Sequence, residues 1–421
     1  MKLQKLFTSA LRSPTARNVH WSLFGNGMYT VLTFVFFVLI AARTLGPDGF
    51  GRFSALVSFI ILLAELTDMG IGPSLSRFIP PLLAQKKEQT AQKIIKSGFL
   101  FELVVSVALS IGVFLSAPFL STYLFDGTPA SLIRISAIGI GAITLFVFGV
   151  FVFSAYQEFQ YTALMNTLLA LGRVGVAVFL IFFGSFHISS AVVTFILPAF
   201  FVWGISFLFL KHNYLRVSVN LTHFLELFSF AKYIAVNKIA SAIASRVDVL
   251  ILIALVDAHA SGIYSAAIRI TQIYLLAAGS LSAVFAPKFS LYKTVHEAQK
   301  FTQKVFLIVM LFLVSVVLLF FIADPFIPIL FGSEYIPAVP VFRALLVPIS
   351  FFILQLPFTG LVVYTLKKPS VVAVAAIVQL IIIVVSNFYL VPYIAIYAPV
   401  VGLGLGYASA LVILMFGTWY F

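Results

Sequence analysis

The chain has 421 residues, of which 62% are hydrophobic and only 9% are charged. Soluble domains carry roughly 25% charged residues, so this composition excludes a soluble globular protein and indicates a polytopic membrane protein. The chain contains no cysteine, which excludes disulfide bonds and thiol chemistry.

A helix needs about 20 apolar residues to cross a membrane, and in lipid its backbone must satisfy its own hydrogen bonds. Hydropathy along the chain predicts twelve such helices. Those of the first half cover residues 21–42, 53–72, 98–119, 132–154, 162–184 and 189–210. Those of the second half cover residues 232–256, 262–287, 304–323, 341–364, 370–390 and 397–420, and the first of these six is the least hydrophobic.

These helices divide into two groups of six. We therefore predict an all-α protein with an N-terminal six-helix lobe over residues 21–211 and a C-terminal six-helix lobe over residues 232–421, joined by a cytoplasmic linker at 212–231. Residues 1–20 are basic and too weakly apolar for a secretory signal peptide. They predict a short helix at the membrane interface.

The distribution of Lys and Arg predicts the orientation of the chain. Every second loop is basic, whereas the alternate loops contain only Arg43 and Arg52 beside several acidic residues. Because positive loops stay in the cytoplasm, both termini are expected to be cytoplasmic. This basic rim accounts for most of the net charge of +13 and predicts contact with anionic phospholipids rather than with nucleic acid.

Two parts of the sequence resemble each other at an offset of 211 residues. Gly51-Arg-Phe-Ser-Ala55 corresponds to Gly262-Ile-Tyr-Ser-Ala266, and Arg77-Phe78 corresponds to Lys288-Phe289. Asn26 corresponds to Asn237 in the same register. A duplicated membrane protein is typical of transporters, which bind their substrate between the two halves.

Polar side chains inside several of these helices are candidate functional residues. A charged side chain at a helix centre costs about 2.5–3.5 kcal/mol on insertion scales, so it is expected to face protein or water. The candidates are Asn26, Glu65, Asp68, Arg173, Asn237, Lys238, Arg246, Asp248, Arg269 and Gln272. They concentrate in the first two helices of each half, which favours a central cavity, although hydrogen bonding between helices is an alternative. The helices at 304–323 and 370–390 are almost wholly aliphatic and aromatic, as expected of lipid-facing spans.

Several other chemistries are excluded by the motifs that the chain lacks. It has no Gly-Lys-Ser/Thr phosphate loop, and His296-Glu297 lacks the second histidine of a zinc-protease helix. Gly402-Leu-Gly-Leu-Gly406 lies within an apolar segment, where close helix packing explains the glycines better than nucleotide binding does. We therefore expect no cofactor, no metal and no enzymatic activity.

Two loop motifs resemble those of a known family. Arg43-Thr-Leu-Gly-Pro-Asp-Gly-Phe-Gly51 follows the first span, and Asp68-Met-Gly-Ile-Gly72 closes the second. With Arg246-Val-Asp248 and the segment from Gly262 to Arg269, they resemble the polysaccharide transporter family. This family comprises Wzx-like flippases of lipid-linked oligosaccharides, within the superfamily that also contains the MATE drug exporters.

The resemblance implies a cavity lined by the first, second, seventh and eighth helices, with basic residues for a lipid diphosphate. The resemblance assigns the binding of this diphosphate to Lys238, Arg246 and Arg269. Asp68 and Asp248 would pair with these cations or couple transport to an ion. It also implies a multi-pass protein of the cytoplasmic membrane that moves a polyprenyl-diphosphate-linked glycan. Polysaccharide polymerases and glycosyltransferases are the expected protein partners.

Two other functions remain open from the residues alone. A MATE-type multidrug exporter coupled to a cation gradient would need an acidic, aromatic cavity, which Glu65 and Asp68 could serve. A membrane enzyme of glycan assembly would need a sizeable external loop or a cluster of catalytic residues at one interface, and the sequence shows neither.

Overall fold

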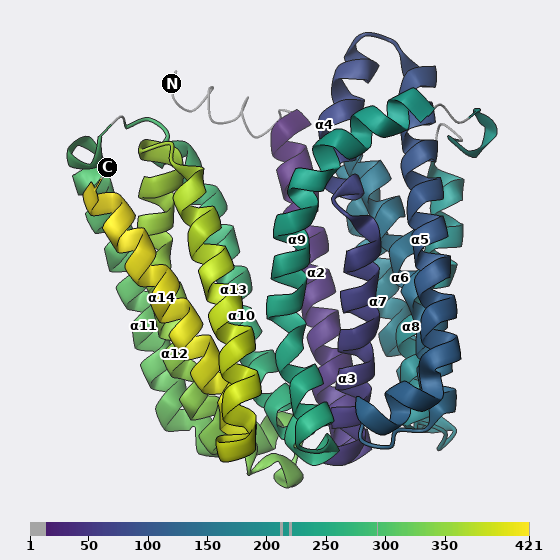
Figure 1. Cartoon of the computed structure of the whole chain (residues 1–421), viewed down its shortest axis with the longest axis vertical. Coiled ribbons are helices and arrows are strands. Elements are labelled where there is room, and N and C mark those ends of the chain that lie inside the picture. The colour runs from purple at the N-terminus through teal and green to yellow at the C-terminus, as the bar shows by residue number, and fades with distance from the viewer. Residues whose placement is uncertain (1–13, 211–213, 219–220, 293, 421) are drawn as a thin grey trace, which may run out of the picture. The chain divides into compact units, whose positions relative to one another are not determined.

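Every regular element of the described chain is a helix, and no strand occurs among residues 14–210, 214–218, 221–292 and 294–420 of this computed structural model (Figure 1). The prediction of an all-α protein is confirmed. The basic segment predicted at 1–20 lies mostly outside the described residues.

The helices follow the predicted spans closely. In the first half they are α2 (Pro14–Phe34), the π-helix η1 (Val35–Ala42), α3 (Arg43–Asp68), α4 (Ile71–Ala84), α5 (Glu88–Tyr123), α6 (Ala130–Ala155), α7 (Phe159–Phe182) and α8 (Ile188–Phe209). In the second half they are η2 (Tyr214–Arg216), α9 (Leu221–Leu255), α10 (Ala258–Phe289), α11 (Val295–Phe331), η3 (Ser333–Tyr335), α12 (Ala338–Gly360), η4 (Leu361–Thr365), α13 (Pro369–Ile394), η5 (Ala395–Tyr397) and α14 (Ala398–Tyr420). Each of the twelve predicted spans falls largely on one of these helices.

Nine helical segments within the described residues are long and apolar enough to cross a membrane. The count is lower than twelve for two reasons. The first two predicted spans continue as one 49-residue segment, His20–Asp68, and the last two continue as one 52-residue segment, Pro369–Tyr420. The seventh, α9, is the least hydrophobic of the predicted spans and is not among the nine.

One helix was not predicted. Residues 73–97 lie between two predicted spans and form one of the basic loops, yet α4 occupies Ile71–Ala84 and α5 begins at Glu88. The buried side chains of α4 include Ile71, Leu75 and Ile79, which are spaced four residues apart and so share one face. The prolines and charges of this segment concealed an amphipathic helix that packs against α5 and α6.

The chain divides into two compact units. The first unit comprises residues 1–44, 56–123 and 127–242, and the second comprises residues 45–55, 124–126 and 243–421. The division falls inside α9, between Ala242 and Ile243. Two short segments of the first half, 45–55 and 124–126, therefore pack with the second unit.

Each unit has its own helix packing. In the first unit α5 and α8 pack on α6, while α2 packs on α7 (Figure 1). Its core gathers Phe99 of α5, Phe148 of α6 and Tyr214 of η2, whose rings meet edge to face or at a tilt. In the second unit α14 packs on both α12 and α13, and α12 also contacts α10 and α11.

Candidate functional site

The carboxylate of Asp68 is the centre of a buried polar cluster in the first unit. Asp68 is the last residue of α3, and its oxygens accept hydrogen bonds from the backbone N–H groups of Gly70 at 3.0 Å and Gly72 at 2.9 Å. These donors belong to the start of α4, where backbone N–H groups have no partner within the helix. The side chain of Asp68 therefore joins the end of one helix to the start of the next.

Backbone conformation and close packing require glycine at two positions of this motif. Gly70 has φ +77°, a left-handed conformation that glycine adopts without penalty, and a Cβ atom on it would lie 2.5 Å from the carbonyl oxygen of Ala231 on α9. A Cβ atom on Gly72 would lie 2.2 Å from the ring of Phe151. The motif Asp68-Met-Gly-Ile-Gly72 thus allows α9 and α6 to approach the turn closely.

The cation of this cluster is Lys238 of α9. Its Nζ lies 2.6 Å from Oδ2 of Asp68, across 170 residues of sequence, and 5.4 Å from the ring centre of Phe151. The side chain of Lys238 is 21% exposed and that of Asp68 is 2% exposed. Because a buried carboxylate needs a partner, this ion pair holds the middle of α9 against the end of α3.

A second carboxyl group belongs to the same cluster. Glu102 of α5 is 2% exposed, and its Oε1 has no hydrogen-bond partner among the described atoms. Its carboxyl group lies within hydrogen-bonding reach of Asp68. The first unit therefore buries two acids beside one lysine.

The second unit has a separate buried cluster around Asp248 of α9. Its carboxylate accepts hydrogen bonds from the hydroxyl of Tyr264 on α10 and from the amide of Asn387 on α13, each at 2.7 Å. All three side chains are nearly or wholly buried. These two partners of Asp248 are a phenol and an amide, which orient the carboxylate without neutralising it.

Asn387 lies on the narrow buried face of its helix. The segment at 370–390 was expected to face lipid, and most of its apolar side chains are exposed or partly exposed, but Asn387 is 0% exposed and contacts Asp248. Sequence reasoning missed Asn387 and Tyr264 as members of this cluster. A lone asparagine in an apolar span was the signal that could have identified the first.

Arg173 of α7 is fully enclosed in the first unit. It is 2% exposed, its Nε donates to the carbonyl oxygen of Phe195 at 3.1 Å, and its guanidinium lies 3.8 Å from the ring centre of the same residue. In this conformation Arg173 ties α7 to α8.

The remaining predicted site residues lie in more open positions. Asn26 of α2 is exposed, and Glu65 of α3 is partly buried. Arg246 of α9 with Arg269 and Gln272 of α10 are also partly buried. The side chain of Asn237 lies outside the described part of the structure.

The repeat seen in the sequence has a counterpart in the second unit. A Cβ atom on Gly51 would lie 1.9 Å from the carbonyl oxygen of Ala258, and one on Gly262 would lie 1.9 Å from the carbonyl oxygen of Pro47. Both pairs of glycine and carbonyl are related by the offset of 211 residues. The two copies of the motif therefore meet backbone to backbone, and only glycine fits at their contact.

Polar contacts surround this meeting point. Nδ1 of His259 lies 3.1 Å from Oδ1 of Asp48, and these residues are again 211 positions apart. Asp126 accepts from the backbone N–H of Ala258 at 3.1 Å and pairs with Arg52 at 3.4 Å. Segments 45–55 and 124–126 are thus fastened to the start of α10.

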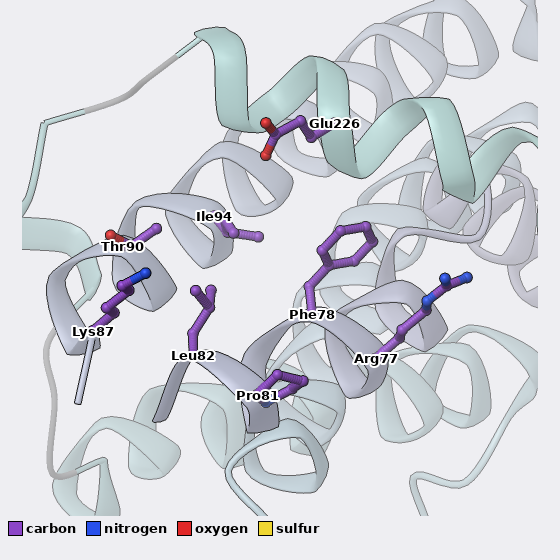
Figure 2. A pocket seen from close by; sticks show the side chains of 8 residues that line it. All are labelled: Arg77, Phe78, Pro81, Leu82, Lys87, Thr90, Ile94 and Glu226. Atoms are coloured by element: carbon purple, nitrogen blue, oxygen red, sulfur yellow. The ribbon is translucent and has the colours of Figure 1, made fainter. Parts of the chain in front are cut away.

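The first unit also has a groove of about 570 Å³ between α4, α5 and α9 (Figure 2). Arg77 and Lys87 lie at its two ends, and apolar side chains lie between them. Arg77 stacks 3.9 Å above the ring centre of Phe230, while Glu226 reaches the groove from α9. The other lining residues are Phe78, Pro81, Leu82, Thr90 and Ile94.

A family model described as "polysaccharide biosynthesis protein" matches residues 40–340 of the chain, more than half of its length. The chain belongs to this family. Among curated protein sequences, none matches it.

Solved structures share the fold along almost the whole chain. An inward-facing MATE family multidrug resistance transporter of the MOP superfamily is 14% identical, with a TM-score of 0.74 over 95% of this chain and 94% of that one. The lipid II flippase MurJ in an inward closed conformation is 18% identical, with a TM-score of 0.71 over 94% and 87%. A MOP superfamily transporter from Pyrococcus furiosus, described as having a binding pocket of reverse polarity, is 15% identical, with a TM-score of 0.65 over 97% and 96%.

This polysaccharide biosynthesis protein is therefore a multi-pass membrane protein with the fold of MOP superfamily transporters. The solved structures named above that share its fold are described as transporters and a flippase. Within the described residues, no group of three or more His, Asp or Glu side chains is placed to hold a metal ion.

Proposed function

We propose that this family member is a flippase that moves a polyprenyl-diphosphate-linked oligosaccharide from the cytoplasmic to the outer leaflet by alternating access. The observation that carries the proposal is the match to a polysaccharide biosynthesis family in a chain that has the fold of a lipid II flippase. Cell-surface polysaccharides are assembled on such lipids, so the proposed place of action is the cytoplasmic membrane.

The chemistry of the cargo explains the proposed binding residues. A diphosphate carries two or more negative charges, and the planar guanidinium of arginine binds phosphate oxygens in pairs. Lys238 and Arg246 of α9 and Arg269 of α10 are the cations that we assign to the headgroup. Two negative charges moving outward across 100 mV gain about 4.6 kcal/mol, at roughly 2.3 kcal/mol each, so a membrane potential that is negative inside can drive the step.

The other predicted residues take supporting roles in this proposal. Asn26, Asn237 and Gln272 would donate hydrogen bonds to the glycan or the diphosphate, and Arg173 would join them in a conformation that exposes it. Glu65, Asp68 and Asp248 would pair with cations or couple transport to an ion. The partners that we propose are polysaccharide polymerases and glycosyltransferases, which consume and supply such glycans.

The proposal predicts that removing either arginine strongly lowers transport in cells. In a bacterial strain that lacks its own flippase, the wild-type chain should restore surface glycan, whereas Arg246→Ala and Arg269→Ala should each lower it at least about tenfold, as expected from losing a charge-assisted contact of roughly 1.5–3 kcal/mol. Surface glycan is measured by antibody or lectin binding at equal protein levels.

The matched control is Arg134→Ala. Arg134 of α6 is exposed and lies 5.4 Å from the ring centre of Phe114, which suits an interfacial cation without a transport role. Full rescue by the Arg246 and Arg269 variants would contradict their assignment to the headgroup.

A MATE-type exporter of organic cations is the second candidate, favoured by the fold shared with a multidrug transporter. It is distinguished in the same strain, because it would give resistance to cationic dyes and leave surface glycan unrestored.

We also propose that the groove binds the phosphate of an anionic phospholipid. Either cation, Arg77 or Lys87, suits the phosphate, and the apolar residues between them suit the first methylene groups of the chains. The basic loops predict that this side faces the cytoplasmic headgroups. The double variant Arg77→Gln/Lys87→Gln should weaken phosphatidylglycerol binding several-fold per cation, from about 1 kcal/mol each. Native mass spectrometry measures the bound lipid.

The control for this experiment is the double variant Lys300→Gln/Lys304→Gln, which removes two exposed cations from α11 in the second unit. Equal losses of lipid in the groove variant and in the control would show that only overall charge matters, and would contradict a site in the groove.

A further inference from the structure

The cluster around Asp68 has an excess of negative charge if all its groups are ionised. Asp68 and Glu102 are each 2% exposed, and one lysine, Lys238, accompanies them. Two carboxylates and one ammonium leave one negative charge without compensation. Burying an unpaired charge costs several kcal/mol even after relaxation, so the folded unit favours a neutral form of the cluster.

The described groups near Glu102 offer no second cation. The titratable side chains that face it are Asp68 from α3, Lys238 from α9 and Tyr214 from η2. Burial raises the pKa of the Tyr214 phenol above its ordinary value, so this group stays neutral at pH 7. Lys96, on the same helix as Glu102, donates instead to the carbonyl oxygens of Leu215 at 2.9 Å and Val217 at 2.5 Å.

The hydrogen-bond donors near the two acids differ. Asp68 accepts from Lys238 and from two backbone N–H groups. Glu102 has none of these donors, and its Oε1 has no partner among the described atoms. Two carboxyl groups within hydrogen-bonding reach can bond only if one of them carries a proton.

We propose that Asp68 and Glu102 form a proton-binding site, in which Glu102 holds the proton and donates it to the carboxylate of Asp68. Release of the proton leaves Glu102 as a carboxylate and restores the uncompensated charge. The release must then be accompanied by hydration of the cluster or by movement of the middle of α9, which Lys238 joins to Asp68. This inference makes no use of the identity of the cargo.

Infrared spectroscopy tests the proposal on the full-length protein in a glycoside detergent, which, unlike phospholipid, has no ester carbonyl that would mask the band. A protonated carboxyl group gives a C=O stretching band that carboxylates lack. The spectrum of wild type at pH 7 should contain this band. Glu102→Gln should lose it, because the variant has no carboxyl group at this position. The amide resembles the neutral acid in shape, so the variant is expected to fold. Glu65→Gln, which removes a partly buried acid from α3, should leave the band unchanged.

Two results would overturn the proposal. They are the absence of the band in wild type at pH 7, and its survival in Glu102→Gln. The wild-type spectrum decides the first without any variant, so a failure of Glu102→Gln to fold does not remove the test. Since no glycan is present, these results are independent of those that test the flippase function.

Discussion

A reversible cross-link between cysteines at positions 48 and 259 should stop transport completely, and reduction should restore it. Asp48 and His259 occupy equivalent positions of the two repeats and lie 3.1 Å apart through their side-chain atoms. The basic loops predict that this contact lies on the side opposite the cytoplasm. The proposed alternating access would separate the repeats there in order to release the cargo.

The chain suits this experiment because it contains no native cysteine. The side chains of Asp48 and His259 are 74% and 54% exposed, so thiols at Asp48→Cys and His259→Cys are accessible to a short bifunctional thiol reagent whose bonds reduction cleaves. Rescue of surface glycan is measured before and after treatment. Each single variant, treated in the same way, should transport normally; unchanged transport in the cross-linked double variant would refute opening at this contact.

Gly262→Ala should destabilise the protein by about 1–3 kcal/mol or more, the usual cost of forcing atoms into a packed contact. The added Cβ atom would lie 1.9 Å from the carbonyl oxygen of Pro47 and 3.0 Å from the backbone nitrogen of Gly51. Both neighbours are backbone atoms, so the contact cannot be relieved by rotating a side chain. The midpoint of thermal unfolding in detergent, followed by tryptophan fluorescence, measures the loss.

Gly279→Ala is the matched control on the same helix, α10. A Cβ atom on Gly279 would meet nothing within 4 Å. Alanine is the better helix former, by roughly 0.8–1.0 kcal/mol, so this variant should be as stable as wild type or slightly more stable. Equal destabilisation by the two substitutions would show that the contact between the repeats contributes little.

Hydropathy predicts the helices of this protein well because a single physical requirement, satisfaction of the backbone in lipid, determines where they lie. The offset of 211 residues likewise identifies Gly51 and Gly262 as equivalent. It does not predict that these glycines touch, because equivalence in sequence says nothing about how the repeats pack.

The candidate site was harder to predict than the helices. Lys238 contacts Asp68 across 170 residues, and Asn387 contacts Asp248 across 139 residues. Such pairs depend on the rotation of each helix about its axis, and apolar helices pack through shape and interhelical hydrogen bonds that hydropathy does not encode. Glu102 lies near the start of the predicted helix at 98–119, a position typical of an interfacial side chain, so the sequence alone does not identify it as buried.

The most direct test of the flippase function is a transport assay with purified protein in liposomes. A polyprenyl-diphosphate-linked oligosaccharide is placed in both leaflets, and a membrane-impermeant glycosidase is added outside. With the protein, the glycosidase should digest the glycan of both leaflets, because glycan from the inner leaflet is delivered to the outside. Digestion limited to the outer leaflet, as in protein-free liposomes, would contradict the proposed function.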